Sequence, residues 1–329
     1  MWGPALLVHS LLELDAFLGE DRYLPFARAY CERFLRRPPR IDQSDTCAPA
    51  LATWAVFRKT GNPVLRTLSE RVVFYMKNEP RVIGEAVNHL GHSAEGRFYP
   101  KSVWVDSLMM FGVFAARYAS EVGDSELLDF AARQPALYAR LLQNPESGLF
   151  AHSYRTGSRA PYPRGISWGR GNGWVAASLP LILGFLPQGH PEREGILSIL
   201  RRVSEALLSL QRPDGYWETV LDRPGRTYRE SSATALIAAG WLRSVREGWL
   251  DERFRGPAFT AFEALVSDLG PEGEEPRMRG ISAPTIPLPF FPYLGYALSP
   301  RGENLSYGLA ALFLAAVEYG RSLSFRDSH

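Results

Sequence analysis

Two aspartates precede strongly apolar segments, where a carboxyl group could act as an acid or a base. Asp106 lies in WVDSLMMFG and Asp45 in IDQSDTCAPAL. Because burial disfavours the charged form, we expect the pKa of Asp106 to be raised, which would suit a general acid. Two carboxyl groups facing one pocket would match the pairs that act in glycoside hydrolysis. Each aspartate could instead only cap its helix, and Asp42 is a rival for the position of Asp45.

The stretch SWGRGNGW, residues 167–174, combines groups that suit a sugar ligand. Trp168 and Trp174 offer indole faces that can stack on a sugar ring. Arg170 offers a planar fork to a carboxylate, and Asn172 can both donate and accept hydrogen bonds. The glycines would let the backbone approach a ligand closely. A glycine-rich phosphate loop is the rival interpretation, but no Lys-Ser/Thr pair follows and no strand precedes the stretch.

Three further side chains are candidates for the walls of the same pocket. His152 in GLFAHSYRTG and His89 in AVNHLGHS lie in expected loops, where a histidine could equally be solvated only. Trp217 in DGYWE could line the pocket or pack in the core. The two cysteines have no CxxC spacing and no HExxH pair occurs, so we expect no metal site, no disulfide framework and no cofactor.

Segments of two kinds alternate along the chain and must position these residues. Six are apolar on nearly every side, as buried helices are. They begin near Trp2, Asp45, Trp104, Gly171, Glu230 and Asn304. Between them, segments with one apolar stripe and many charges indicate half-exposed helices. These cover residues 21–36, 62–77, 124–143, 191–211 and 251–268. No segment of any length alternates as a strand would.

This alternation predicts an all-α fold, an (α/α)6 barrel in which an outer ring of helices encloses an inner ring, as a single domain over residues 1–329. A toroid would bring all six lead-in loops to one mouth. The alternative, an α-solenoid or a generic helical bundle, would spread them along a face. Eleven helices are expected, and the chain begins at an inner one. We therefore expect either a gap in the outer ring, where the usual N-terminal helix would lie, or a natural chain that starts further upstream.

Composition and charge argue against several classes of partner. The formal net charge is +2 and no run of like charges occurs, so the sequence does not indicate a basic surface for nucleic acid or for an anionic membrane. No apolar run is long enough to span a bilayer. The start, MWGPALLVHSLLELDAF, lacks the basic region of a signal peptide. We therefore expect a cytoplasmic protein with no nucleic-acid or membrane partner, whose oligomeric state is open.

Taken together and in order, these segments resemble glycoside hydrolase families 88 and 105, the unsaturated glucuronyl and rhamnogalacturonyl hydrolases. The motifs run from near residue 40 to near residue 317 and are WVDSLMM, GLFAHSY, WGRGNGW, PDGYW, ESSATALIA and NLSYGLAALFLA. The resemblance implies an (α/α)6 barrel that needs no metal. It also implies removal of a 4,5-unsaturated uronic acid from the non-reducing end of oligosaccharides made by polysaccharide lyases. In that chemistry an aspartate protonates C4 of the vinyl ether, water adds at C5, and the hemiketal opens and releases the sugar.

The resemblance also implies roles for individual residues. Asp106 matches the family's general acid/base. Asp45 matches its second aspartate, because TWAVFRKTGN follows it as in that family's helix. His152 matches a histidine of the substrate pocket. The residues that match the sugar-binding motif are Trp168, Arg170, Asn172 and Trp174.

Two segments depart from the family pattern and leave alternatives open. Residues 79–100 lack its Trp-His-Lys segment, where either His89 or His92 could substitute. Residues 271–299 are Pro-rich, so the leaving-sugar subsite is not carried over and the oligosaccharide could derive from pectin or from a glycosaminoglycan. One alternative is an epimerase of the N-acylglucosamine type, which would need paired histidines as bases. Another is a non-catalytic member that only binds acidic oligosaccharides.

Overall fold

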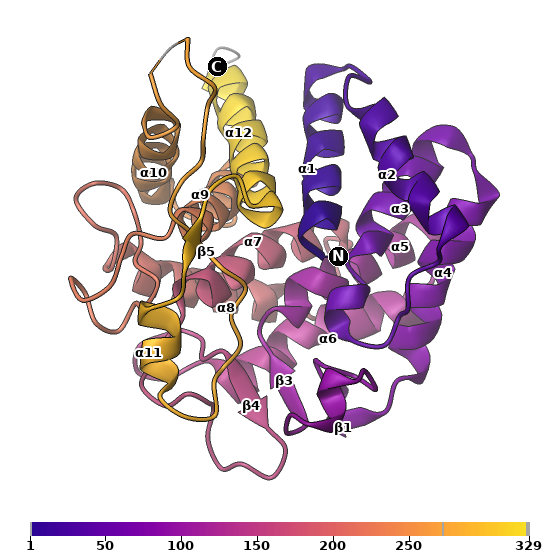
Figure 1. Ribbon diagram of the computed structural model, residues 1–329, viewed down its shortest axis with the longest axis horizontal. Helices are drawn as coiled ribbons and strands as arrows, with labels where there is room; N and C mark the ends of the chain where they lie inside the picture. Colours follow the sequence, from indigo (N-terminus) through magenta and orange to yellow (C-terminus); the bar gives the residue numbers. More distant parts are fainter. Residues whose placement is uncertain (1, 272, 327–329) are drawn as a thin grey trace.

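The computed structural model describes residues 2–271 and 273–326, whose long helices form two rings (Figure 1). The inner helices are α1 (Trp2–Leu18), α3 (Pro49–Thr60), α5 (Val113–Val122), α7 (Gly169–Phe185), α9 (Ser231–Arg246) and α12 (Ser306–Arg326). The outer helices are α2 (Leu24–Arg36), α4 (Pro63–Asn78), α6 (Ser125–Leu142), α8 (Arg193–Leu208) and α10 (Arg255–Ser267). Each inner helix contacts the next one along the chain, and α12 contacts α1, which closes the ring. The predicted (α/α)6 barrel is confirmed.

The two kinds of helix differ in how they bury their side chains. The outer helix α8 buries one stripe, and its apolar members are Ile196, Leu197, Leu200, Val203 and Leu207. The inner helix α7 is buried on nearly every side, because α5 and α9 flank it and α8 covers it. A helix enclosed in this way can have no polar face. The all-round apolar character of the inner segments in the sequence therefore has a direct physical cause.

Small residues let the inner helices approach one another closely. Gly240 of α9 faces the backbone of α7, and a Cβ atom there would lie 2.0 Å from the carbonyl oxygen of Ala176. Only glycine fits such a contact without moving one of the helices. This position is therefore a packing requirement of the barrel.

Short strands that no sequence pattern predicts lie at the end of the barrel where the inner helices begin. They pair into three antiparallel ribbons: β1 (Arg81–Ile83) with β2 (Ala86–Val87), β3 (Ser102–Trp104) with β4 (Ser153–Arg155), and β5 (Ile281–Ser282) with β6 (Arg301–Gly302). Strands of two or three residues are too short to show a period of two. The β3–β4 ribbon and the short helix α11 (Pro292–Ala297) lie at the lower edge of Figure 1.

Two of the predicted helix starts are wrong. Asp45 lies in a 3₁₀ turn, Ser44–Thr46, and α3 begins only at Pro49, which has no N–H to leave unpaired at a helix start. Asp106 lies in a turn between β3 and a π-helical turn, Leu108–Gly112. Neither carboxyl group caps a helix, so both are free for another role. π-Helical turns are frequent at functional sites.

Two further features complete the fold. Within the ranges that the structure describes, no helix combines the length and the apolar character needed to cross a membrane. Cys31 and Cys47 are both buried, and neither forms a disulfide.

Candidate active site

The β3–β4 ribbon brings Asp106 and His152 together. Trp104 of β3 pairs with Ser153 of β4, and the backbone N–H of Val105 donates to the carbonyl of His152 over 2.9 Å. The residues that follow and precede these positions therefore face each other. His152 Nε2 lies 3.2 Å from Asp106 Oδ2, with the histidine side chain fully buried and the carboxyl group 13% exposed.

A second carboxylate–histidine pair lies beside the first. His89 Nε2 is 3.5 Å from Asp45 Oδ1, and the His89 backbone N–H donates to Ser102 of β3 over 2.8 Å. His89 Nδ1 lies 2.9 Å from Ser107 Oγ, which donates to Ser44 Oγ over 3.1 Å. Ser44 precedes Asp45 and Ser107 follows Asp106, so this chain of hydrogen bonds holds the segments of the two aspartates together. The two carboxyl groups are close enough for the charge of Asp106 to act on Asp45. That they act together as a catalytic pair stays a prediction.

Aromatic rings separate and support the two histidines. Trp104 stacks on His89 at 4.4 Å between ring centres and meets His152 edge-on at 5.2 Å. Trp168 stacks on the other side of His152 at 4.4 Å. Such packing fixes the imidazole planes. Both histidines are thereby aimed at carboxyl groups rather than at each other.

The two carboxyl groups titrate differently. Burial, with a further contribution from the negative charge of Asp106, raises the pKa of Asp45 to about 7. Burial also acts to raise the pKa of Asp106, but the electrostatic interaction with His152, and to a smaller extent with His89, offsets it and holds that pKa below its usual value. The prediction that burial raises the pKa of Asp106 is therefore wrong, because it left out the histidines.

This arrangement suits proton transfer. Near neutral pH one carboxyl group can carry a proton while its neighbour is ionised, as in other sites where two carboxyl groups take different roles. Burial lowers the pKa of His89 to about 4, so His89 is neutral there and gives Asp45 a hydrogen-bonding partner without a charge. Among the described residues, no group of three His, Cys, Asp or Glu side chains could hold a metal ion.

Asn172 has a different role from the one its motif predicts. The motif suggests a sugar contact, but the side chain is fully buried. Its Nδ2 donates to the carbonyls of Phe150 and Trp168, each over 3.0 Å, and its Oδ1 accepts from the Phe150 N–H over 2.8 Å. The amide therefore holds the segment that leads to His152 and has no free face for a ligand.

Arg170 joins the motif to the C-terminal part of the chain. Its guanidinium donates to the carbonyl of Ser282 over 2.8 Å and to that of Ala283 over 3.0 Å, and it lies 3.8 Å from Glu230. It also covers the ring of Trp168, at 4.7 Å from the ring centre. The side chain is nearly fully buried, so these contacts support the wall that Trp168 forms. Direct contact with a sugar carboxylate stays a prediction for Arg170.

The glycines of the motif serve packing. Residues 169–174 are already helical, at the start of α7, and not a loop. A Cβ atom at Gly169 would lie 2.3 Å from the carbonyl oxygen of Glu218, and one at Gly171 would lie 2.9 Å from the Trp168 ring. The glycines therefore bring α7 close to the neighbouring loop and let Trp168 fold back over its own helix, which is a different use from close approach to a ligand.

The remaining two tryptophans lie in different surroundings. Trp174 is 2% exposed and meets Trp2 edge-on at 6.2 Å. The indole N–H groups of Trp168 and Trp174 have no hydrogen-bond partner within the described residues, and such buried donors are uncommon unless a ligand or water serves them. Trp217, by contrast, packs edge-on against Trp241 and donates to the carbonyl of Leu207 over 2.8 Å. It belongs to the core, so the expectation that Trp217 lines the pocket is not supported.

Tyr296 is a member of the site that the sequence did not indicate. It lies on α11, in the Pro-rich segment, and its hydroxyl is 2.8 Å from His152 Nδ1. Its ring stacks on Trp168 at 5.9 Å. A phenol that donates to Nδ1 leaves the His152 proton on Nε2, facing Asp106. No local pattern could reveal this contact, because 144 residues separate the two partners in the chain.

Comparison with known proteins identifies the family of this chain. Residues 1–323 match the model of Glycosyl Hydrolase Family 88. The unsaturated rhamnogalacturonyl hydrolase YesR of Bacillus subtilis (strain 168) is 31% identical over 263 residues, which is 78% of this chain and 72% of that protein. An unsaturated 3S-rhamnoglycuronyl hydrolase of Alteromonas sp. (strain LOR) is 26% identical over 296 residues, covering 87% and 68%. The crystal structure of a possible GH105 member from Salmonella enterica serovar Paratyphi A superposes with a TM-score of 0.89 at 24% identity, over 98% of this chain and 83% of that one, which shows a shared fold.

Proposed function

Because the chain belongs to Glycosyl Hydrolase Family 88, we propose that it removes a 4,5-unsaturated uronic acid from the non-reducing end of lyase-generated oligosaccharides. The names of the two relatives point to the same unsaturated class of substrate. The observation that carries the proposal is the pair of adjacent carboxyl groups with opposite pKa shifts, each beside a buried histidine. Such a pair can deliver a proton and take one back.

The proposed reaction is hydration of the vinyl ether. A proton adds to C4 and the elements of hydroxide from water add to C5, so one water molecule is consumed and the C4–C5 double bond becomes a single bond. The hemiketal formed at C5 then opens to a ketone. The ring opening leaves a hemiacetal at C1, which releases the hydroxyl group of the leaving sugar. No bond to the anomeric carbon needs to be attacked directly.

We assign the proton transfers to Asp106. In the free site its carboxylate is ionised beside His152. The carboxylate of an incoming uronate would repel that charge and raise the pKa of Asp106, which favours uptake of the proton that C4 then receives. The resulting carboxylate can accept a proton from the attacking water. Asp45, which keeps its proton up to about pH 7, would donate a hydrogen bond to the sugar.

The surroundings would support these steps. His152, held between Trp168 and Tyr296, keeps Asp106 in place. The indole rings of Trp168 and Trp174 supply apolar surface and unpaired N–H donors for the sugar. The sugar contact predicted for Arg170 would add charge recognition of the uronate.

The test is the ultraviolet absorbance of the conjugated double bond during incubation with lyase-digested pectin and, separately, with lyase-digested chondroitin. We expect the signal to fall with one of the digests, which identifies the substrate class. The fall should be absent for Asp106→Asn and retained for Asp42→Asn. Asp42 is the matched control, because it is also nearly buried but pairs with Arg40. Near-normal turnover by Asp106→Asn would refute the assignment, and no signal with either digest would favour the binding-only alternative.

A further inference from the structure

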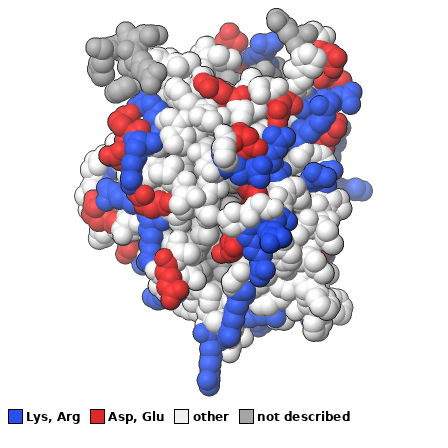
Figure 2. All heavy atoms as spheres, turned by 90° about the vertical axis from the view of Figure 1, so that its left-hand side faces the viewer, with Lys and Arg blue, Asp and Glu red and all other residues white. Residues whose placement is uncertain are grey.

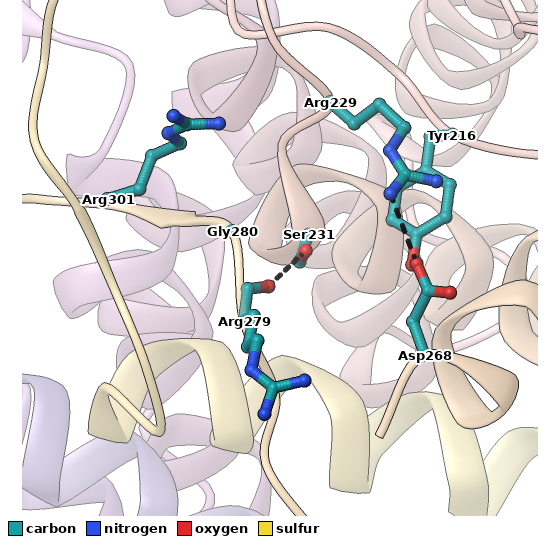
Figure 3. Close-up of a pocket in the computed structure, with 7 residues that line it drawn as sticks. All are labelled: Tyr216, Arg229, Ser231, Asp268, Arg279, Gly280 and Arg301. Carbon is teal, nitrogen blue, oxygen red and sulfur yellow. Dashed lines mark hydrogen bonds and ion pairs between the residues drawn. The ribbon is translucent and has the colours of Figure 1, made fainter. Parts of the chain in front are cut away.

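A second pocket, with a volume of about 370 Å³, lies where α9 begins beside the β5–β6 ribbon (Figure 3). It is lined by Tyr216, Arg229, Ser231, Asp268, Arg279, Gly280 and Arg301. None of these residues takes part in the proposed reaction. The pocket is therefore a separate concave site.

Positive charge dominates its lining, with three arginines against one aspartate. Arg229 lies 3.4 Å from Asp268, and Arg279 lies 3.3 Å from Glu303. Arg301 has no acidic partner within the described ranges 2–271 and 273–326. In Figure 3, Arg301 and Arg229 lie on opposite sides of Ser231 and Gly280. On the face of the molecule that lies at the left of Figure 1, basic and acidic side chains are interspersed (Figure 2).

The arginines and the floor of the pocket are held in place by the protein. Arg229 covers the ring of Tyr216 at 4.6 Å, and Arg301 covers that of Tyr228 at 5.1 Å. Ser231 Oγ donates to the carbonyl of Arg279 over 2.6 Å, and the Ser231 N–H donates to Gly280 over 3.2 Å. The N–H and hydroxyl groups of Ser231, at the start of α9, thus already have acceptors. Attraction for a ligand must therefore come from the guanidinium groups.

We propose that this pocket binds an oxyanion carried by an acidic sugar, at a site additional to the catalytic one. Guanidinium groups present planar forks of N–H donors that match carboxylate and sulfate oxygens. The volume falls in the range of ligand pockets and far exceeds what a single ion needs. Among the described residues, no acidic side chain neutralises the cation that Arg301 supplies. The ligand chemistry is therefore a carboxylate or sulfate group on a sugar ring, or the same oxyanion free in solution.

Isothermal titration calorimetry on the full chain tests this with sodium sulfate and with sodium glucuronate, each at an ionic strength matched with sodium chloride. We expect saturable binding that Arg301→Gln weakens by about tenfold or more, as expected for loss of a charged hydrogen-bond donor. Arg66→Gln is the matched control, because Arg66 is an exposed arginine on α4 paired with Glu70, and it should bind like the wild type.

The two probes separate the sources of the oxyanion. Glucuronate binding lost in Arg301→Gln supports a sugar-borne group, and sulfate binding lost in the same variant supports a free oxyanion in this pocket. Equal binding by Arg301→Gln and the wild type, or no saturable binding of either probe, overturns the proposal. These binding measurements do not depend on turnover of the unsaturated substrate, so their outcome is independent of the proposed reaction.

Discussion

Asp45 and Asp106 each lie beside a buried histidine, but their pKa values are shifted in opposite directions. Both carboxyl groups are partly buried, with the side chains of Asp45 and Asp106 31% and 13% exposed, and burial acts to raise both pKa values. The difference comes from charge. The electrostatic interaction of Asp106 with His152, and to a smaller extent with His89, lowers its pKa. His89 does not lower the pKa of Asp45 in this way, and the negative charge of Asp106 raises that pKa further.

A histidine neighbour therefore does not by itself set the protonation state of a carboxyl group. The charge of the histidine and the residues that hold its ring also determine the pKa of the neighbouring carboxyl group. The pKa of His89 is lowered to about 4 by burial, so it is neutral in the range where enzymes usually work. His152 is held by Tyr296 and Trp168 with one ring nitrogen directed at Asp106. Changing either fact should change the titration of the neighbouring aspartate.

The largest expected effect is on Asp106. Asp106→Asn keeps the shape of the side chain but removes its ability to exchange a proton, so we expect kcat to fall by about 10²–10⁴-fold. Substrate affinity should change little, which initial-rate measurements and titration of the unsaturated disaccharide can check together. A variant in which affinity collapses while kcat survives would assign Asp106 to binding alone.

The pH dependence tests Asp45. Its raised pKa means that the protonated form is present below about pH 7 and is lost as the pH rises through that value. If the protonated form binds the sugar, kcat/KM should fall by about tenfold per pH unit on the alkaline side. Any residual activity of Asp45→Asn should lack this limb. A wild-type profile that is flat from pH 6 to pH 9, roughly the span over which such a group titrates, would remove Asp45 from the mechanism.

His152→Gln would sharpen the comparison by making the two aspartates alike. Without the interaction with His152, burial of Asp106 is opposed less strongly, so its pKa should rise. Because the protonated form of Asp106 delivers the proton to C4, the alkaline limb of the kcat profile that belongs to Asp106 should then move to higher pH, with a lower maximum. Nuclear magnetic resonance titration of the carboxyl carbon offers a direct reading, and an unchanged Asp106 pKa would contradict the role given to His152.

Tyr296→Phe should have the smallest effect. It removes one hydrogen bond to His152 and keeps the ring that stacks on Trp168. A net loss of about 0.5–1.5 kcal/mol corresponds to a decrease in kcat of roughly 2- to 10-fold. The KM should stay near the wild-type value. Tyr319→Phe, whose hydroxyl contacts Glu263 far from the site, is the control. Equal rates for both variants would mean that Tyr296 does not position His152.

The main features of the fold were readable from the sequence because they depend on local patterns. A helix enclosed on all sides must be apolar on all sides, and a half-exposed one needs only a stripe. The β3–β4 ribbon could not be predicted in this way, because three residues show no period. The start of α3 at Pro49 was also missed, since the preceding segment forms a 3₁₀ turn around Asp45.

The site was predictable to the extent that single residues carry chemistry. Asp106, Asp45, His152 and His89 were all found by type, and the structure brings them together in two pairs. Roles that depend on partners were not predictable. Asn172 and Trp217 carry groups that could bind a sugar, but these groups already form hydrogen bonds with the protein backbone. The pKa of Asp106 depends on two histidines whose distance no sequence spacing reveals.

We propose that the glycosidic bond breaks through hydration of the double bond, and the reaction in heavy water tests this step directly. The wild-type enzyme and its lyase-digested substrate are incubated in D₂O, and the released sugar is analysed by nuclear magnetic resonance and mass spectrometry. We expect one deuterium on C4 of a saturated keto sugar, transferred through Asp106. Release of a uronic acid that keeps its C4–C5 double bond and carries no carbon-bound deuterium would contradict it.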